Sequence, residues 1–312
     1  MLALAKYTLK GPYQAAIVVA LLAIAAVFLP LVVGQSLLGG LATAIFIVMA
    51  SALVGLIILT QGTRSGLKAI IVSIFGITLV TTLVLKTPAL GLSIGLMQWL
   101  PIVILAQTLR TTRSLALMIL AGLVLATAAI AMQFLIWPDL EARLLPGFQQ
   151  SFAQLADNPA LDSNMIAEYT RLLAHWSVLL LVPMLYMMFV SIMLLSRWLQ
   201  GKVAGSDGYN KEFRAISLGK PAALISLTVV LLSSFLDLDW ITSVALIGMV
   251  AFLYQGIAIV HSKFAVSRHR ALIIGIFYAA LIIFPQIMAA SSIAGMLDNW
   301  LIFRKKKNIE PG

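Results

Sequence analysis

Long apolar runs, separated by short polar loops, occupy most of the chain. Most of these runs hold about 20 residues, the number that an α-helix needs to cross ~30 Å of hydrocarbon at ~1.5 Å per residue. The pattern predicts an all-α fold, a polytopic transmembrane helical bundle with eight to nine membrane segments. The expected segments are 15–33, 41–60, 67–85, 91–109, 114–137, 173–196, 221–236, 240–260 and 271–290.

Composition supports a membrane protein. Of the 312 residues, 62% are hydrophobic and only 10% are charged, whereas a soluble domain carries about 25% charged residues. The mean hydropathy is +1.05. The absence of cysteine excludes disulfides, thiolate metal sites and cysteine nucleophiles. No HExxH or GxSxG pattern and no carboxylate pair at metal-ligand spacing occurs, so we expect neither an enzyme nor a bound cofactor.

The net charge of +10 is distributed as a topology signal. With the N-terminus in the cytoplasm, fourteen basic residues fall in inside loops and only Lys86, Arg143 and Arg171 fall outside. Basic and aromatic residues do not interleave over a large patch, so nucleic acid is not an expected partner. The inside residues are Lys6, Lys10, Arg64, Lys68, Arg110, Arg113, Arg197, Lys202, Lys211, Arg214, Lys220, Lys263, Arg268 and Arg270.

The C-terminal tail tests the number of crossings. Nine full crossings would place its four basic residues outside, against the positive-inside rule. The tail is cytoplasmic if the stretch 271–303, interrupted by Pro285, forms a broken or re-entrant pair, or if one earlier segment does not cross. Asp298 is interpreted either as an interfacial partner of the first tail arginine or as a functional residue. The four tail residues are Arg304, Lys305, Lys306 and Lys307.

Two loops are long enough to carry structure of their own. In the outer loop 138–172, apolar residues recur at helical spacing, which predicts two amphipathic helices, the second running into the span near His175. This loop is either a lid over an outward-facing pocket or a segment packed on the bundle. The cytoplasmic loop 197–220 is either a basic interfacial helix or a docking site for a partner, and it contains no P-loop.

Uncharged polar residues are the chemistry that the expected spans contain. An amide in hydrocarbon needs a partner, and a hydrogen bond between helices supplies one. The alternative is a small-molecule pocket, for which an amide and an aromatic face beside the helix-breaking Pro101 are suitable. The candidate ligand-binding residues are Gln98, Trp99, Gln133 and Gln255.

Three stretches resemble the YybS-like bacterial membrane proteins, a family whose domain has no known function. They are Leu59-Thr-Gln-Gly-Thr-Arg-Ser-Gly66, Tyr254-Gln-Gly-Ile-Ala-Ile-Val-His261 and Gly295-Met-Leu-Asp-Asn-Trp-Leu-Ile-Phe-Arg-Lys305. The resemblance extends over nearly the whole chain and implies the cytoplasmic (inner) membrane of a bacterium. Asn299 and Ile302 depart from the family's pattern, in which we expect acidic or less defined residues.

That family looks distantly similar to the substrate-binding subunits of energy-coupling-factor transporters and to MreD-type cell-shape proteins. The similarity implies a six-span module over 1–200 with an outward pocket, followed by 201–312 with the basic loop, two to three further segments and the basic tail. It also implies that an alanine pair four residues apart contacts a coupling subunit, and Ala16 and Ala20 have that spacing. The same spacing promotes ordinary helix packing.

Two functions follow from the sequence. The first is a small-molecule-binding, transporter-like component that has no ATPase of its own and works with membrane partners. The second is a structural or biogenesis scaffold whose basic loops and tail recruit cytoplasmic proteins or anionic lipids. A polar cavity inside the bundle, open to the outside, would favour the first function. A filled bundle with a cytoplasmic groove would favour the second.

Overall fold

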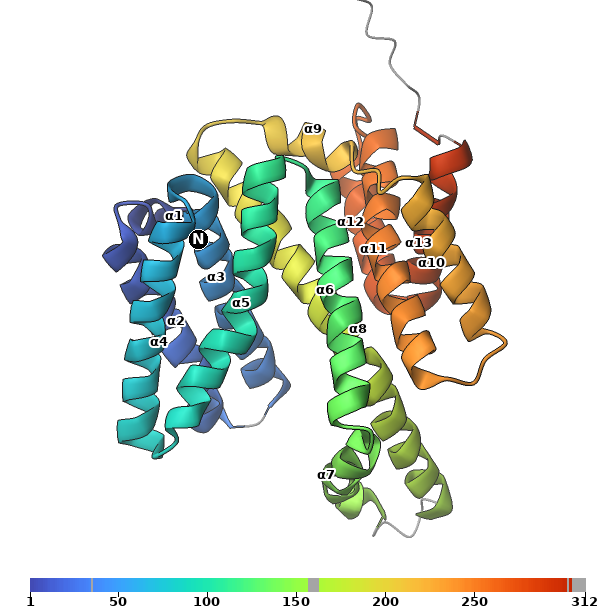
Figure 1. Cartoon of the computed structure of the whole chain (residues 1–312), viewed down its shortest axis with the longest axis horizontal. Coiled ribbons are helices and arrows are strands. Elements are labelled where there is room, and N and C mark those ends of the chain that lie inside the picture. Colours follow the sequence, from blue (N-terminus) through green and yellow to red (C-terminus); the bar gives the residue numbers. More distant parts are fainter. Residues whose placement is uncertain (35, 157–162, 302, 305–312) are drawn as a thin grey trace, which may run out of the picture. The chain divides into compact units, whose positions relative to one another are not determined.

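A computed structural model of the chain describes residues 1–34, 36–156, 163–301, 303 and 304 (Figure 1). Every regular element in those ranges is a helix, which confirms the predicted all-α bundle. The helices are α1 (Leu2–Thr8), α2 (Pro12–Val33), α3 (Leu37–Gln61), α4 (Thr63–Leu85), α5 (Pro88–Thr112), α6 (Leu115–Ile136), α7 (Leu140–Ala156), α8 (Ser163–Val203), α9 (Gly208–Arg214), α10 (Lys220–Ser233), α11 (Asp239–Lys263), α12 (Arg270–Ile283) and α13 (Pro285–Leu301).

Seven of the described helices are long and apolar enough to cross a membrane, namely α2, α3, α4, α5, α6, α8 and α11. Helices α12 and α13 together provide an eighth segment, although they are bent by 114°. Helix α10 is apolar but has only 14 residues, or about 21 Å of helix. These elements correspond to the nine segments expected from the sequence, and the chain is a multi-pass membrane protein.

The bend between α12 and α13 confirms the predicted break at Pro285. Helix α12 ends at Ile283, Phe284 is extended, and α13 begins at Pro285. Proline disfavours the helical conformation at the preceding residue and is well tolerated in the first turn of a new helix. The side of the membrane on which the tail lies stays a prediction.

The outer loop forms the two helices that the sequence predicts. Helix α7 covers its first half, and the second half belongs to α8, which continues without interruption through the expected span for 41 residues. Nδ1 of His175 on α8 lies 2.9 Å from Oε2 of Glu141 on α7. Helix α7 therefore contacts the bundle through a polar pair. Its role as a lid stays a prediction, and the loop residues 157–162 lie outside the described ranges.

The chain forms two compact units, and each is discontinuous in sequence. The first consists of residues 1–122 and 188–216, and the second of residues 123–187 and 217–312. Helices α6 and α8 contribute residues to both units, which is why a cut at one point in the sequence does not separate them. The family similarity implied a different division, a transporter-like module over 1–200 followed by 201–312, and that division stays a prediction.

The first unit has a filled apolar interior. Helix α3 runs through it, and Leu53, Ile57 and Ile102 are fully buried. A single residue, Gly62, joins α3 to α4 at φ +101°, a conformation that glycine adopts without a steric penalty. The charged residues of this unit lie near the ends of its helices or between them.

In the second unit, α11 and α13 cross at very close range. A Cβ atom on Gly256 would overlap the carbonyl oxygen of Ser291, and one on Gly295 would overlap the carbonyl oxygen of Phe252. Small residues four apart let two helix backbones approach in this way. Ser291 and Gly295 have that spacing on α13.

Candidate functional site

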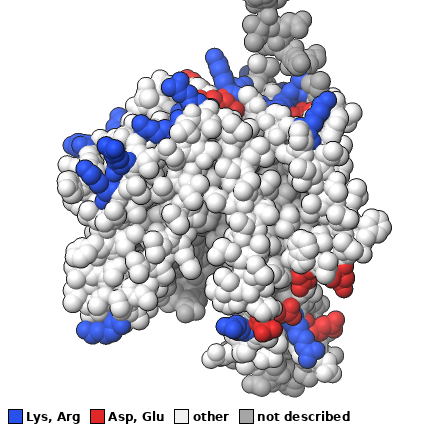
Figure 2. Space-filling view, viewed as in Figure 1, with Lys and Arg blue, Asp and Glu red and all other residues white. Residues whose placement is uncertain are grey.

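The first unit carries nearly all of its basic residues at one end. The α3–α4 turn, the α5–α6 connection and the ends of α1, α8 and α9 meet there, and Gln61 donates from Nε2 to the carbonyl oxygen of Leu9 at 2.7 Å. Lys86 stands at the opposite end, between α4 and α5. Figure 2 shows charged side chains near helix ends and a broad surface without them between. The basic residues are Lys6, Lys10, Arg64, Lys68, Arg110, Arg113, Arg197, Lys202, Lys211 and Arg214.

A cavity of about 400 Å³ opens at this basic end. It lies where the ends of α3, α5 and α8 meet the short helix α9. Three of its residues are arginines and one is a glutamate, so the lining has a net charge of +2. The lining residues are Leu59, Leu109, Arg110, Arg113, Arg197, Gln200 and Glu212.

Two lining residues donate to carbonyl groups in the last turn of α3, and one of these, that of Ile58, also accepts from the backbone N–H of Gly62 at 3.1 Å. Arg110 donates from Nη1 to the carbonyl oxygen of Ile58 at 2.7 Å, and Gln200 donates from Nε2 to that of Leu59 at 3.2 Å. The last carbonyls of a helix have no intrahelical partner, and a cation is favourable beside them. Arg110 and Gln200 therefore hold α5 and α8 against α3 and fix the walls of the cavity.

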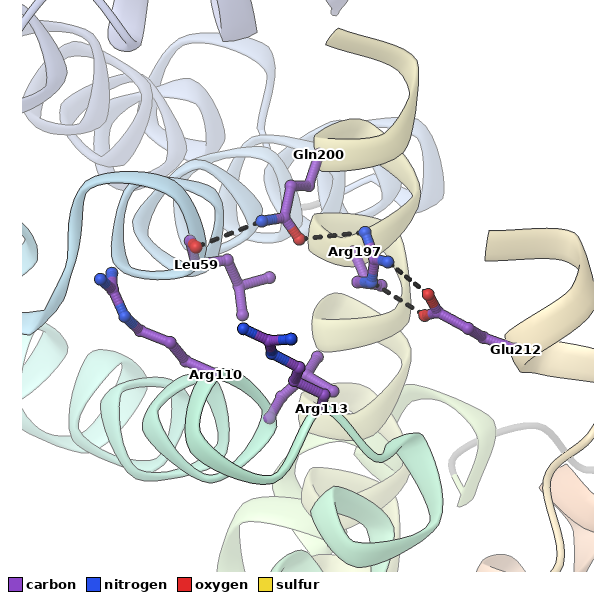
Figure 3. A pocket seen from close by; sticks show the side chains of 7 residues that line it. Leu59, Arg110, Arg113, Arg197, Gln200 and Glu212 are labelled. Atoms are coloured by element: carbon purple, nitrogen blue, oxygen red, sulfur yellow. Dashed lines mark hydrogen bonds and ion pairs between the residues drawn. The ribbon is translucent and has the colours of Figure 1, made fainter. Parts of the chain in front are cut away.

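Arg197 is fully engaged by protein groups. Its Nε donates to Oε2 of Glu212 at 2.9 Å, and its Nη2 makes a second contact with Oε1 of the same carboxylate. Its Nη1 donates to Oε1 of Gln200 at 3.1 Å. Figure 3 shows this chain of contacts from α9 through Arg197 and Gln200 to Leu59. The Arg197 side chain is 22% exposed and that of Glu212 is 36% exposed.

Arg113 differs from the other two arginines of the cavity. It follows α5 in the left-handed conformation, with φ +53°, and its backbone N–H donates to the carbonyl oxygen of Leu109 at 2.9 Å. Within the described part of the chain its guanidinium group makes no hydrogen bond or ion pair. Figure 3 shows this group pointing into the space between Leu59 and Arg197, whereas that of Arg110 points away toward the end of α3. Arg113 thus offers five unused donors to the cavity.

Of the two residues predicted to bind a ligand in the first unit, Trp99 is buried and Gln98 is partly buried. Gln98 donates from Nε2 to the hydroxyl of Ser51 at 3.0 Å, which joins α5 to α3. Trp99 is 1% exposed. This geometry matches the alternative interpretation, a hydrogen bond between helices, and a ligand-binding role for the pair stays a prediction.

The two remaining candidates lie in the second unit. Gln133 donates from Nε2 to the carbonyl oxygen of Val178 at 3.0 Å, and its buried Oε1 has no partner among the described atoms. Gln255 is fully buried; its Oε1 accepts from the backbone N–H of Leu218 at 2.9 Å, and its Nε2 donates to Asp298 at 3.1 Å. The protein itself uses both groups of the Gln255 amide, and ligand binding by either glutamine stays a prediction.

The residues predicted to bind partners have contacts within the chain. The carbonyl oxygen of Ala16 accepts from the hydroxyl of Ser73 at 3.0 Å, and a Cβ atom on Gly76 would lie 3.8 Å from that of Ala20. The alanine pair therefore faces α4. Arg304 pairs with Asp298, as the interfacial interpretation of Asp298 expects. Lys305, Lys306 and Lys307 lie outside the described residues.

The sequence assigned Arg110, Arg113 and Arg197 to loops on one side but did not identify them as a site. Their shared side was the available signal. It could not show that these particular loops meet, since Arg113 and Arg197 are far apart in sequence. Comparison with known proteins adds no assignment, because no family model, curated protein or solved structure matches the chain.

Proposed function

We propose that this membrane protein is a transporter-like component that binds a small anionic molecule in the arginine-lined cavity and has no ATPase of its own. The observation that carries the proposal is the unpaired guanidinium group of Arg113, which points into a cavity with a net positive lining. No catalytic residue is assigned.

The size and chemistry of the cavity support a small ligand. Its volume of about 400 Å³ falls within the range of ~300–1,000 Å³ that is typical of small-molecule sites. Leu59 and Leu109 supply apolar walls, and both are nearly buried at 8% and 4% exposure. The other five of the seven lining residues are charged or polar, which suits a polar, anionic ligand better than an apolar one.

The orientation of the chain is part of the proposal. We place the basic end of the first unit and the N-terminus in the cytoplasm of a bacterial cell, because lysine and arginine accumulate in loops on that side. The ligand would then enter from the cytoplasm. This differs from the outward pocket that the family resemblance implies.

A second function, the scaffold, is favoured by the contrast in charge between the two ends of the first unit. Ten basic residues lie at one end and only Lys86 at the other. The ten form a surface that attracts anionic lipids or acidic proteins at ~1 kcal/mol per basic residue near the membrane. Under this function, neutralising the four tail residues from Arg304 to Lys307 releases cytoplasmic partners from the membrane. Unchanged co-purification would leave the tail as a topology signal.

Affinity purification from native membranes in a mild detergent distinguishes the two functions. Mass spectrometry would identify both the proteins and the small molecules that accompany the full chain. The proposal expects a stoichiometric anionic molecule that is lost in Arg113→Gln and retained in Arg143→Gln, an exposed arginine on α7. Recovery of cytoplasmic machinery with an empty cavity would support the scaffold instead.

A further inference from the structure

We infer that the cavity recognises a phosphate group and that Glu212 is a built-in competitor, occupying Arg197 until the phosphate displaces it. The inference rests on the proposed function, since it names the ligand's chemistry and a gate at the same site. Its observations are the two-point contact between Arg197 and Glu212 and the unused donors of Arg113 beside it.

The contact of Arg197 with Glu212 shows what this arginine can hold. A carboxylate that meets two nitrogens of one guanidinium group is a planar pair of anionic oxygens, and a phosphate presents a similar pair. Arg197 is therefore already arranged for a ligand of that shape. The third nitrogen donates to Gln200, which keeps the guanidinium plane fixed when the anion changes.

Charge selects a phosphate monoester over a carboxylate. Once Glu212 has left Arg197, the three arginines of the lining present a charge of +3 to the ligand. A phosphate monoester carries about −1.5 to −2 at neutral pH and has three strong acceptor oxygens. Such a group can accept from Arg113 and Arg197 together, whereas a single carboxylate, with one negative charge, leaves a larger excess of positive charge in the lining.

The Glu212 carboxylate is placed to give way. Its side chain is 36% exposed and that of Arg197 is 22% exposed, so water can solvate the carboxylate after it leaves Arg197. Helix α9, which carries it, has only seven residues. The connection from α8 contains Gly205 at φ +66°, and the other ion pair nearby, Lys202 with Asp207, has a separation of 4.0 Å.

Loss of the Glu212 contact should therefore loosen α9. Phe213 keeps the helix attached, because its side chain is buried at 7% exposure. We expect larger motion of the exposed face of α9 around this anchor, without unfolding of the unit. Phosphate binding and α9 mobility are then two readouts of one exchange.

The phosphate can belong to a soluble monoester or to an anionic phospholipid headgroup. Both offer the same group to Arg113 and Arg197. The cavity opens at a helix end, where headgroups also lie, so the experiment needs a separate arm for each source.

The chain contains no cysteine, so a single spin label can report on α9. We would label Asn210→Cys, an exposed position on this helix, in the full chain in detergent. Titration with inorganic phosphate should at least double the mobile fraction of the label. Glu212→Gln should be mobile without phosphate and bind phosphate about fivefold more tightly, while Glu212→Asp retains the gate. Asp207→Asn, which removes the neighbouring exposed carboxylate, should behave as the parent chain.

The second arm replaces detergent with nanodiscs of phosphatidylcholine, with or without phosphatidic acid, in phosphate-free buffer. Mobilisation by phosphatidic acid alone identifies the lipid as the source, and mobilisation by inorganic phosphate alone identifies a soluble monoester. If the parent and Glu212→Gln bind phosphate equally and the mobility of the label does not change, Glu212 is not a gate, although the cavity still binds phosphate. Failure of the parent, Glu212→Gln and both lipid mixtures to show any binding or mobilisation overturns phosphate recognition. The proposed function is overturned separately, if purification from native membranes yields no anionic molecule that depends on Arg113.

Discussion

Arg304 donates from Nε to Oδ2 of Asp298 at 3.0 Å, and the side chain that receives this hydrogen bond is only 3% exposed. The same carboxylate accepts from the amide of Gln255 at 3.1 Å and from the backbone N–H of Phe303 at 3.0 Å. Gln255 in turn accepts from Leu218. One buried anion therefore ties the end of α13 to α11 and to the segment before α10.

The first prediction concerns this ion pair. Arg304→Gln should lower the free energy of unfolding by about 3–5 kcal/mol, because it leaves a buried carboxylate without its cation. The double variant Asp298→Asn with Arg304→Gln should recover most of the loss. Thermal unfolding in detergent measures both. Equal stability of the single variant and the parent would mean that water compensates the carboxylate.

The second prediction concerns the crossing of α11 and α13. Gly256→Ala and Gly295→Ala should each destabilise the second unit by at least 1–3 kcal/mol, since the added methyl group meets backbone atoms that cannot move aside. Gly275→Ala on α12 is the matched control, because a Cβ atom there meets nothing within 4 Å. It should be neutral or stabilise by up to ~1 kcal/mol. A similar cost at all three positions contradicts the close crossing.

The third prediction separates two interpretations of Gln98. The hydrogen bond to Ser51 predicts that Gln98→Leu costs about 0.6–2 kcal/mol of stability and leaves anion binding at the basic end unchanged. The interpretation from sequence alone predicts that the same variant folds and loses its ligand. Unfolding and binding measured on one preparation decide between them, and lost binding with unchanged stability would restore the interior pocket.

The fourth prediction places the C-terminus on the same side of the membrane as the N-terminus. A bend of 114° exceeds a right angle, so α13 runs partly back toward the side on which α12 begins. The hydroxyl of Ser217, just before α10, donates to Oδ1 of Asn299 near the end of α13 at 3.4 Å. In oriented membrane vesicles, single cysteines at Lys6 and Lys306 should react with an impermeant maleimide from one side, and a cysteine at Lys86 from the other. If the maleimide reaches the tail cysteine from the same side as Lys86→Cys, the stretch 271–303 crosses the membrane fully.

Local features of this chain are readable from its sequence because a bilayer enforces them. Apolar run length predicts the spans, and Pro285 favours the break, since its ring disfavours the helical conformation at the residue before it. The apolar spacing in the outer loop predicts that α8 extends beyond its span. The pairing of Asp298 with Arg304 is local in the same sense, because six residues separate them.

The cavity was not predictable in this way. Arg113 and Arg197 line one cavity whose walls include Arg110 and Gln200, which bind carbonyl groups in the last turn of α3, and such contacts leave no pattern in a sequence. The partners of the buried amides were not predictable for a related reason. Gln98 and Gln255 are polar residues in apolar helices, which indicates either a ligand or a partner within the protein, and only the packing shows the partners Ser51 and Asp298.

The most direct test of the central claim is a crystal structure of the full chain grown with arsenate, which has the shape and charge of phosphate and scatters anomalously. We predict an arsenic peak in the cavity, within hydrogen-bond distance of the guanidinium groups of Arg113 and Arg197, with the Glu212 carboxylate turned away. The peak should be absent from Arg113→Gln crystals grown identically. A cavity without a peak at saturating arsenate, with the Arg197–Glu212 contact intact, would contradict the account.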